Sequence, residues 1–195
     1  ELQLATNHLG HFAMALGLHP ALAAAEDAGI VSVSSSGHGN AGIDLADLFF
    51  DRRPYDPGVA YGQSKTANVL FAVEAHRRWG GDGITTNALM PGGVWTGLQQ
   101  HWDPATLEAM KAQVAATDAS GMGVKTPEQG AATSVLLAAW PDLEGSGGRY
   151  FEDCHEAEVV DQVADGLHGV CAHALDPVVA ERLWEVSTEL VTEAY

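Results

Sequence analysis

A tyrosine and a lysine stand four residues apart in the segment AYGQSKTANVLF, residues 60–71. Side chains at positions i and i+4 of a helix lie on one face, so Tyr61 and Lys65 would point into the same space if this segment is helical. A free tyrosine titrates near about pH 10, but a neighbouring lysine cation favours the phenolate and lowers that pKa. The pair therefore predicts a group that exchanges protons, with an ordinary polar helix edge as the alternative.

The segments around this pair alternate between helical and extended patterns. GIVSVSSS indicates a buried strand, and ITTNALM indicates a second strand that stops at Pro91. Asp or Thr followed by Pro opens several of the expected helices, because these residues suit the cap and the first turn. In chain order, the expected elements are a helix up to about Leu18 with a short turn after Pro20, a strand at 29–36, a loop at 37–60, a helix at 61–79, a strand from 84 to 90, helices at 103–116 and 126–140, a strand at 148–152 and a helix at 176–191.

This order of helices and strands predicts an α/β fold in which parallel β/α units share a single sheet. About three strands are expected, whereas a doubly wound sheet normally has about six. We therefore expect residues 1–195 to form one partial domain, with the front strands of the sheet encoded before Glu1.

Composition excludes several classes of partner. The chain has 195 residues, and its 9 Lys+Arg against 26 Asp+Glu give a formal net charge of -17. That charge repels phosphate backbones and anionic membranes, so no nucleic-acid partner is expected. The N-terminal segment has no basic region, and His19 and Pro20 interrupt its apolar run, so neither a signal peptide nor a membrane span is expected. Cys154 and Cys171 lack the spacing of a disulfide framework, which predicts free thiols and a cytoplasmic location.

Polar residues gather where the expected strands end. In open α/β sheets, ligands bind beyond the carboxyl ends of the strands. The first strand ends in serines and the second in a Pro-Gly pair, and the tyrosine and lysine lie near the start of the helix between them. The polar cluster expected at this edge consists of Asn7, Ser34, Ser35, Ser36, Tyr61, Lys65, Pro91 and Gly92.

These residues resemble the short-chain dehydrogenase/reductase family over nearly the whole chain. TNHLGHF looks like the segment with that family's helix asparagine, VSVSSSG like its serine strand, YGQSK like its Tyr-x-x-x-Lys, and NALMPGGVWT like its Pro-Gly segment. The long interval between Ser35 and Tyr61, together with GGRYFEDC and AERLWEVS near the end, resembles the retinol-dehydrogenase-like branch. The resemblance implies a Rossmann-like doubly wound parallel sheet, of which the chain carries the C-terminal part.

The resemblance also implies a role for each residue of the polar cluster. Tyr61 would be the general acid/base that exchanges a proton with the substrate oxygen, and Lys65 would lower its pKa and hold the nicotinamide ribose. Ser35 would hydrogen-bond the substrate oxygen, with the serines on either side as the register alternatives. Asn7 would support a water that relays protons to Lys65. Reduction of a carbonyl indeed needs a hydride, a proton donor and a hydrogen bond to the oxygen as charge develops.

The implied cofactor is NAD or NADP. The family's glycine-rich turn and the residue that selects between the two cofactors have no counterpart in this sequence, so the preference is left open. The residues expected at the nicotinamide end are Tyr61, Lys65, Pro91, Gly92, Val94 and Thr96, with glycine allowing close backbone approach.

The implied substrate is an apolar small molecule that carries an alcohol or a carbonyl group. Three apolar side chains that follow the Pro-Gly segment, Trp95, Leu98 and Trp102, are the candidate walls of its pocket. Association into a homo-oligomer is a further expectation, because leaving out the front strands would expose a strand edge and apolar helix faces.

Other readings of the sequence are weaker. A truncated, non-catalytic piece that acts by association is one alternative, and a sugar-nucleotide epimerase or dehydratase, which shares the tyrosine and lysine, is another. His8 and His11 lack a third metal ligand, and the set Cys154, His155, Cys171 and His173 fits no zinc spacing. SSSGHG is not the G-x-S-x-G turn of a hydrolase.

Overall fold

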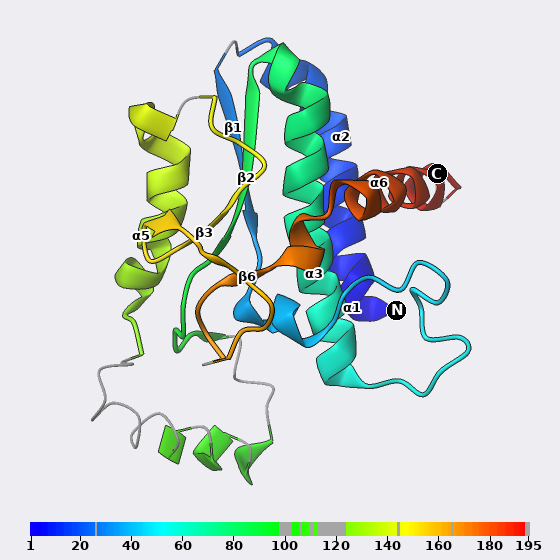
Figure 1. Cartoon of the computed structure of the whole chain (residues 1–195), viewed down its shortest axis with the longest axis vertical. Helices are drawn as coiled ribbons and strands as arrows, with labels where there is room; N and C mark the ends of the chain where they lie inside the picture. Colours follow the sequence, from blue (N-terminus) through cyan, green and yellow to red (C-terminus); the bar gives the residue numbers. More distant parts are fainter. Residues whose placement is uncertain are drawn as a thin grey trace.

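The computed structural model of the chain describes residues 1–25, 27–97, 103–105, 107–109, 111–112, 124–143, 145–164 and 166–193. Within these residues the expected α/β fold is confirmed: a mixed, mainly parallel sheet lies between helices (Figure 1).

The described part of the sheet has four strands in the order β1-β2-β3-β4. They are β1 (Ala28–Val33), β2 (Ile84–Met90), β3 (Tyr150–Glu152) and β4 (His155–Glu156). The first three are parallel, with Val33 opposite Leu89 and Met90 opposite Glu152, and β4 turns back antiparallel to β3. A separate parallel pair is formed by β5 (Val159–Val160) and β6 (Val170–Cys171).

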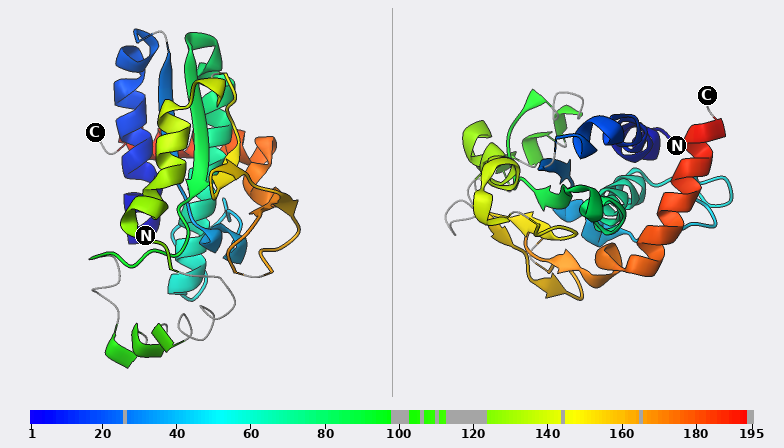
Figure 2. Two further views of the ribbon diagram at one scale, coloured as in Figure 1. Left: turned by 90° about the vertical axis from the view of Figure 1, so that its left-hand side faces the viewer. Right: turned by 90° about the horizontal axis from the view of Figure 1, so that it is seen from above.

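Helices cover both faces of the sheet. On one face lie α2 and α3, with α6 packed on α3, and on the other lies α5 (Figure 2). The helices are α1 (Leu2–Leu4), α2 (Gly10–Ala23), α3 (Pro57–Trp79), α5 (Pro127–Ala139) and α6 (Pro177–Glu193). A π-helical turn, η1 (Ala5–Leu9), joins α1 to α2, and the 3-10 turns are η2 (Ser36–Asn40), η3 (Gly80–Asp82), η5 (Pro141–Leu143) and η6 (Ala172–Leu175).

Two helix boundaries differ from the prediction. The first long helix does not end near Leu18 but continues to Ala23 with Pro20 inside it, because the N–H of Ala24 still reaches the carbonyl of Pro20 at 3.2 Å. The central helix begins at Pro57 rather than at Tyr61. Its start is fixed by the side chain of Asp56, which accepts the N–H of Val59 at 2.8 Å.

Helix α3 is the centre of the core. Its residues Ala67, Val69, Leu70 and Ala72 have no exposed surface. Val69 and Ala72 pack against β2, whereas Ala67 and Leu70 pack against residues of α1 and α6. Four aromatic rings join α2, α3 and α6, and among them those of Phe71 and Trp184 stack with centres 6.0 Å apart. This packing holds the first turns of α3 at the carboxyl ends of β1 and β2. In the described part of the chain, no helix combines the length and the apolar character that crossing a membrane requires.

Candidate active site

Tyr61 and Lys65 lie on the first turns of α3. Nζ of Lys65 is 5.7 Å from the centre of the Tyr61 ring and donates a hydrogen bond of 3.2 Å to the carbonyl oxygen of Val33, the last residue of β1. Burial of the lysine lowers its pKa. The structure thus brings the phenol and the ammonium together on one face of the helix, at the end of the first strand.

Ser35 lies beside this pair in the turn that follows β1. Its Oγ accepts the N–H of Gly37 at 3.0 Å and so caps the 3-10 turn η2. A Cβ atom at position 37 would lie 2.8 Å from Cε1 of Tyr61 and 3.4 Å from Oγ of Ser35. The absence of a side chain at Gly37 therefore lets the turn carry Ser35 up to the Tyr61 ring.

A second glycine, Gly62, allows the turn η2 to pack closely on helix α3. A Cβ atom at Gly62 would lie 2.8 Å from the carbonyl oxygen of Gly37, closer than a methyl group fits. Gly62 follows Tyr61 directly in the sequence. The lack of a side chain at Gly62 permits the close approach of η2 to the first turns of α3.

Ser34 has a different task from Ser35. It is buried, and its hydroxyl donates to the carbonyl oxygen of Lys65 at 2.8 Å. Ser32, two residues earlier on the same face of the strand, donates to the carbonyl of Asn68 at 2.9 Å. Ser34 is therefore committed to the contact between β1 and α3, whereas Ser35 and Ser36 lie nearer the surface of this edge.

Asn7 reaches the same edge from the π-helical turn η1. Its Nδ2 donates to Oγ of Ser64 at 3.0 Å, and that hydroxyl donates to the carbonyl oxygen of Tyr61 at 2.8 Å. π-helical turns are rare and are often found at functional sites. Asn7 is thus linked to the backbone of Tyr61 through Ser64, a fully buried residue that the sequence analysis did not single out.

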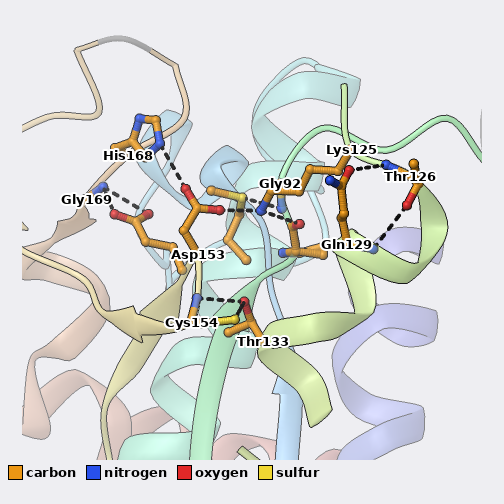
Figure 3. A network of polar contacts seen from close by, with 12 residues as sticks. Gly92, Lys125, Thr126, Gln129, Thr133, Asp153, Cys154, His168 and Gly169 are labelled. Atoms are coloured by element: carbon orange, nitrogen blue, oxygen red, sulfur yellow. Dashed lines mark hydrogen bonds and ion pairs between the residues drawn. The ribbon is translucent and has the colours of Figure 1, made fainter. Parts of the chain in front are cut away.

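The Pro-Gly segment after β2 is held by a lysine from the start of α5 (Figure 3). Gly92 has a φ angle of 91°, and a Cβ atom there would lie 2.6 Å from Nζ of Lys125. That nitrogen donates to the carbonyl oxygen of Pro91 at 3.0 Å, and the N–H of Lys125 donates to the carbonyl of Gly93 at 2.9 Å. Val94 also forms a parallel β-bridge with Lys125, so the backbone after the Pro-Gly segment pairs with the backbone just before α5.

The tip of the β3–β4 hairpin completes this network. Asp153 and Cys154 form a two-residue turn with φ angles of 46° and 63°, the left-handed conformations that suit a tight hairpin. The carboxylate of Asp153 pairs with Nζ of Lys125 and lies 3.3 Å from Nε2 of His168. The hydrogen bond from Lys125 holds the pKa of Asp153 below its usual range. The backbone N–H of Cys154 donates to Oγ1 of Thr133 at 3.1 Å, which ties the turn to α5.

The remaining expected residues divide into two groups. Trp95 is half-buried and Thr96 exposed, both directly after the Pro-Gly segment. Leu98 and Trp102 lie outside the described residues, so their expected place in the substrate pocket stays a prediction.

The histidines and cysteines of the metal readings have separate partners. His8 bonds Oγ of Ser187 at 2.8 Å, and Nδ1 of His11 donates to the carbonyl of Asn7 at 2.9 Å. Cys154 is exposed and Cys171 buried, and both are free thiols. Within the described ranges, no three or more His, Cys, Asp or Glu side chains come together in a group that could hold a metal ion.

Comparison with known proteins adds several relatives of similar sequence. The chain is 56% identical over 195 residues to a protein of Streptomyces antibioticus named "Probable oxidoreductase" and covers 65% of its length. It is 36% identical to "Short-chain dehydrogenase/reductase prx1" of Penicillium roqueforti, with 98% of the chain aligned to 56% of that protein. It is 37% identical to "Retinol dehydrogenase 14" of Mus musculus, with 98% of the chain aligned to 52% of that protein. No protein-family model matches the chain.

A solved structure shares the fold. The chain superposes on the crystal structure of an uncharacterized protein of Mycobacterium paratuberculosis with a TM-score of 0.66 and 30% sequence identity, covering 98% of the chain and 59% of that protein. The chain thus spans less than two thirds of the length of each of these relatives.

Proposed function

The chain belongs to the short-chain dehydrogenase/reductase family, in its retinol-dehydrogenase-like branch, and from this we propose that it is an NAD(P)-dependent oxidoreductase that interconverts an alcohol and a carbonyl. The observation that carries the proposal is the position of Lys65, whose Nζ is 5.7 Å from the centre of the Tyr61 ring while the Ser35 turn packs against that same ring. A proton donor, a cation and a hydroxyl at one strand edge are the groups that carbonyl reduction requires.

Tyr61 is the proposed proton donor in the reduction. Its hydroxyl gives a proton to the substrate oxygen, and the positive charge of Lys65 stabilises the phenolate that forms. In the oxidation the same groups act in reverse, and Tyr61 takes the proton from the alcohol.

Ser35 is the proposed hydrogen-bond donor to the substrate oxygen. Its Oγ already accepts the N–H of Gly37 at 3.0 Å, so the serine uses an acceptor site in the turn and keeps its own proton for donation. A donor fixed in this way stabilises the charge that develops on the oxygen without reorganising during the reaction.

The residues fit the nicotinamide end of the cofactor, which supplies the hydride. Nζ of Lys65 and the hydroxyl of Tyr61 are suitable partners for ribose hydroxyls. Gly93 is exposed, and a Cβ atom there would meet no heavy atom within 4 Å, so the Pro-Gly segment borders open space. We assign Pro91, Gly92, Val94 and Thr96 to this end, with NAD and NADP both as candidates.

Asn7 is the proposed support for a water that passes protons toward Lys65. Because its amide group is fixed on Ser64 at 3.0 Å, its position relative to Tyr61 is fixed as well.

The substrate is proposed to be an apolar small molecule bound beside Trp95, with Leu98 and Trp102 as further candidates. A single partial domain over residues 1–195, a cytoplasmic location and a homo-oligomer complete the proposal.

The proposed chemistry is tested by Tyr61→Phe. A full-length form of the protein is purified and supplied with NADH or NADPH and a panel of apolar aldehydes, and cofactor oxidation is followed. Loss of the proton donor is expected to lower kcat by roughly 100-fold or more with little change in Tm. Tyr55→Phe is the matched control, because Tyr55 is exposed and its hydroxyl contacts Glu1 and Gln3. If the two variants have equal activity, Tyr61 is not the proton donor.

A further inference from the structure

His38 is a fully buried histidine three residues after Ser35, and the proposed chemistry assigns it no role. It lies in the turn η2, which sits beside β6 although the two are far apart in sequence (Figure 1). Its Nδ1 is 2.7 Å from the carbonyl oxygen of Ser35, and its Nε2 accepts the N–H of Cys171 at 3.0 Å. Both ring nitrogens are therefore in hydrogen bonds to backbone groups.

These partners define the tautomer. A carbonyl oxygen only accepts, so Nδ1 must carry the hydrogen. A backbone N–H only donates, so Nε2 must present its lone pair. The ring is consequently neutral, with its proton on Nδ1, and the other tautomer would oppose two acceptors at Ser35 and two donors at Cys171.

The ring acts directly on the backbone of Ser35. The carbonyl oxygen of Ser35 accepts from the ring of His38 and also from its backbone N–H at 3.1 Å. The turn itself is tied to α3, because the carbonyl of His38 accepts the hydroxyl of Thr66 at 3.1 Å. The imidazole thus joins Ser35 to the C-terminal segment that contains Cys171, while Thr66 joins the same turn to the helix of Tyr61.

We propose that His38 is a positioning residue whose Nδ1–H tautomer holds Ser35 beside Tyr61 and couples that serine to the segment Val170–Cys171. The inference rests on the proposed function, in which Ser35 donates to the substrate oxygen. His38 has no exposed surface and its ring contacts the carbonyl oxygen of Ser35, so it acts through Ser35 and not on the substrate.

The competing explanation is that His38 only fills the core. Its ring lies 5.1 Å from the ring of Tyr150, and any side chain of similar size would serve that purpose. The two explanations differ in whether the two ring nitrogens have separate effects.

The first measurement is the ring tautomer in the unmodified chain. Histidine side chains are labelled with ¹⁵N, and the two ring shifts of His38 are assigned by NMR. The proposal expects one neutral ring with hydrogen on Nδ1, and hydrogen on Nε2 would overturn it. This measurement needs no cofactor, no activity and no variant.

The second measurement uses two matched variants. His38→Asn keeps an amide donor near Nδ1 and loses the acceptor at Nε2, whereas His38→Gln keeps an acceptor near Nε2 and loses the donor. The exchange of two amide hydrogens is followed: that of Gly37, which donates to Oγ of Ser35, and that of Cys171. We expect faster exchange at Cys171 alone in the asparagine variant and at Gly37 in the glutamine variant, by about tenfold. Equal changes at both amides in both variants would mean that His38 is only part of the core.

Activity then separates this inference from the proposed function. If Ser35 is positioned by His38, kcat falls about tenfold more in His38→Gln than in His38→Asn, with similar KM and similar Tm. Equal kcat values in the two variants would overturn the positioning role even where Tyr61→Phe abolishes activity. If the protein shows no oxidoreductase activity at all, the tautomer and exchange measurements still decide the role of His38 in fixing the serine.

Discussion

Gly37 packs against the ring of Tyr61 with no room for a side chain between them, since a Cβ atom would stand 2.8 Å from Cε1. Gly37 is not among the glycines with positive φ, so alanine suits its backbone and the contact with the ring is the main obstacle. Adding a single methyl group at position 37 therefore tests whether the turn must lie this close to the helix.

Gly37→Ala is expected to push the Ser35 turn away from Tyr61. We expect kcat to fall by roughly 100-fold, because small displacements of catalytic groups are costly, and the free energy of unfolding to fall by about 1–3 kcal/mol. Gly42→Ala is the control in the loop that follows, where the nearest atom to a Cβ is in ordinary contact at 3.6 Å. Steady-state kinetics and urea unfolding measure both effects, and a Gly37→Ala enzyme as active as the control would show that the turn tolerates displacement.

Lys125 is expected to support the cofactor through the Pro-Gly segment. Lys125→Met removes the hydrogen bond to the carbonyl of Pro91 and the ion pair with Asp153, so the segment loses its fixed position. In a full-length form of the protein, we expect NADH or NADPH to bind about tenfold more weakly, as measured by calorimetric titration. Lys111→Met serves as the control, because Lys111 is an exposed residue paired with Glu108. Equal affinity in the two variants would show that Lys125 does not support cofactor binding.

His8 is expected to make stability depend on pH. Burial, with a smaller effect of His11, lowers the pKa of His8 to about 4, whereas an unfolded histidine titrates near about 6.5. Between these values the unfolded chain binds a proton that the folded chain does not, so stability falls as the pH is lowered from 6.5 toward 4. The loss should reach about 3 kcal/mol near pH 4.

Urea unfolding at a series of pH values measures this loss. His8→Gln should show a flatter dependence than the parent over this range, because the glutamine does not titrate. His155→Gln, at an exposed position, should follow the parent. A His8→Gln curve parallel to that of the parent would assign the pH dependence to other groups.

Glu74 is expected to be the most sensitive charged position in α3. Its carboxylate has no exposed surface and accepts two hydrogen bonds from Arg77, at 2.7 and 2.6 Å, and one from Arg78 at 2.6 Å. Burial alone would raise the pKa of Glu74, but the hydrogen bonds and charges of the two arginines outweigh it and lower the pKa. This contribution to stability is present above the unfolded pKa of about 4.3 and is lost as the pH falls through the lowered folded value.

Glu74→Gln should cost roughly 1–3 kcal/mol in the free energy of unfolding at neutral pH, because a neutral amide replaces the carboxylate in its charge-assisted hydrogen bonds with the two arginines. Glu181→Gln removes only the exposed pair with Arg77, at 3.1 Å, and should cost less than about 1 kcal/mol. Chemical denaturation of both variants gives the comparison. Similar losses for the two would show that the buried carboxylate adds no more than a surface pair.

The sequence predicts those parts of the molecule whose local pattern agrees with the fold. The run before Ser34 is β-branched and apolar, and α3 carries buried residues on the face that meets the sheet, so both elements were expected near their true bounds. The start of α5 was likewise expected from Thr-Pro, and the structure adds a capping box in which Thr126 and Gln129 bond each other's backbone.

Other parts depend on contacts between distant segments. Strands β4, β5 and β6 have two residues each, too few for a periodic pattern, and they exist because of their partners. The role of Lys125 depends on Pro91 and Asp153, which no local pattern connects to it. His38 stands in SSSGHG, yet its bond to Cys171 joins positions far apart in the sequence.

The β1–α3–β2 unit also has a consequence for the order in which the molecule assembles. It is continuous in sequence from Ala28 to Met90, and its helix packs on both of its strands. The contacts of α3 with β1 and with β2 are closer in sequence than those that bring β3 to β2. Proteins form contacts at short sequence separation faster, because less loop-closure entropy is lost.

We therefore expect mutations where α3 packs on β2, such as Val69→Ala, to slow refolding, and mutations in α6, such as Leu183→Ala, mainly to speed unfolding. Denaturant-dependent folding rates of the two variants would show the difference. Since Ser35, Tyr61 and Lys65 all lie within the early unit, the groups proposed to transfer the proton would be in place before the segment with Lys125 and Asp153 docks onto the sheet.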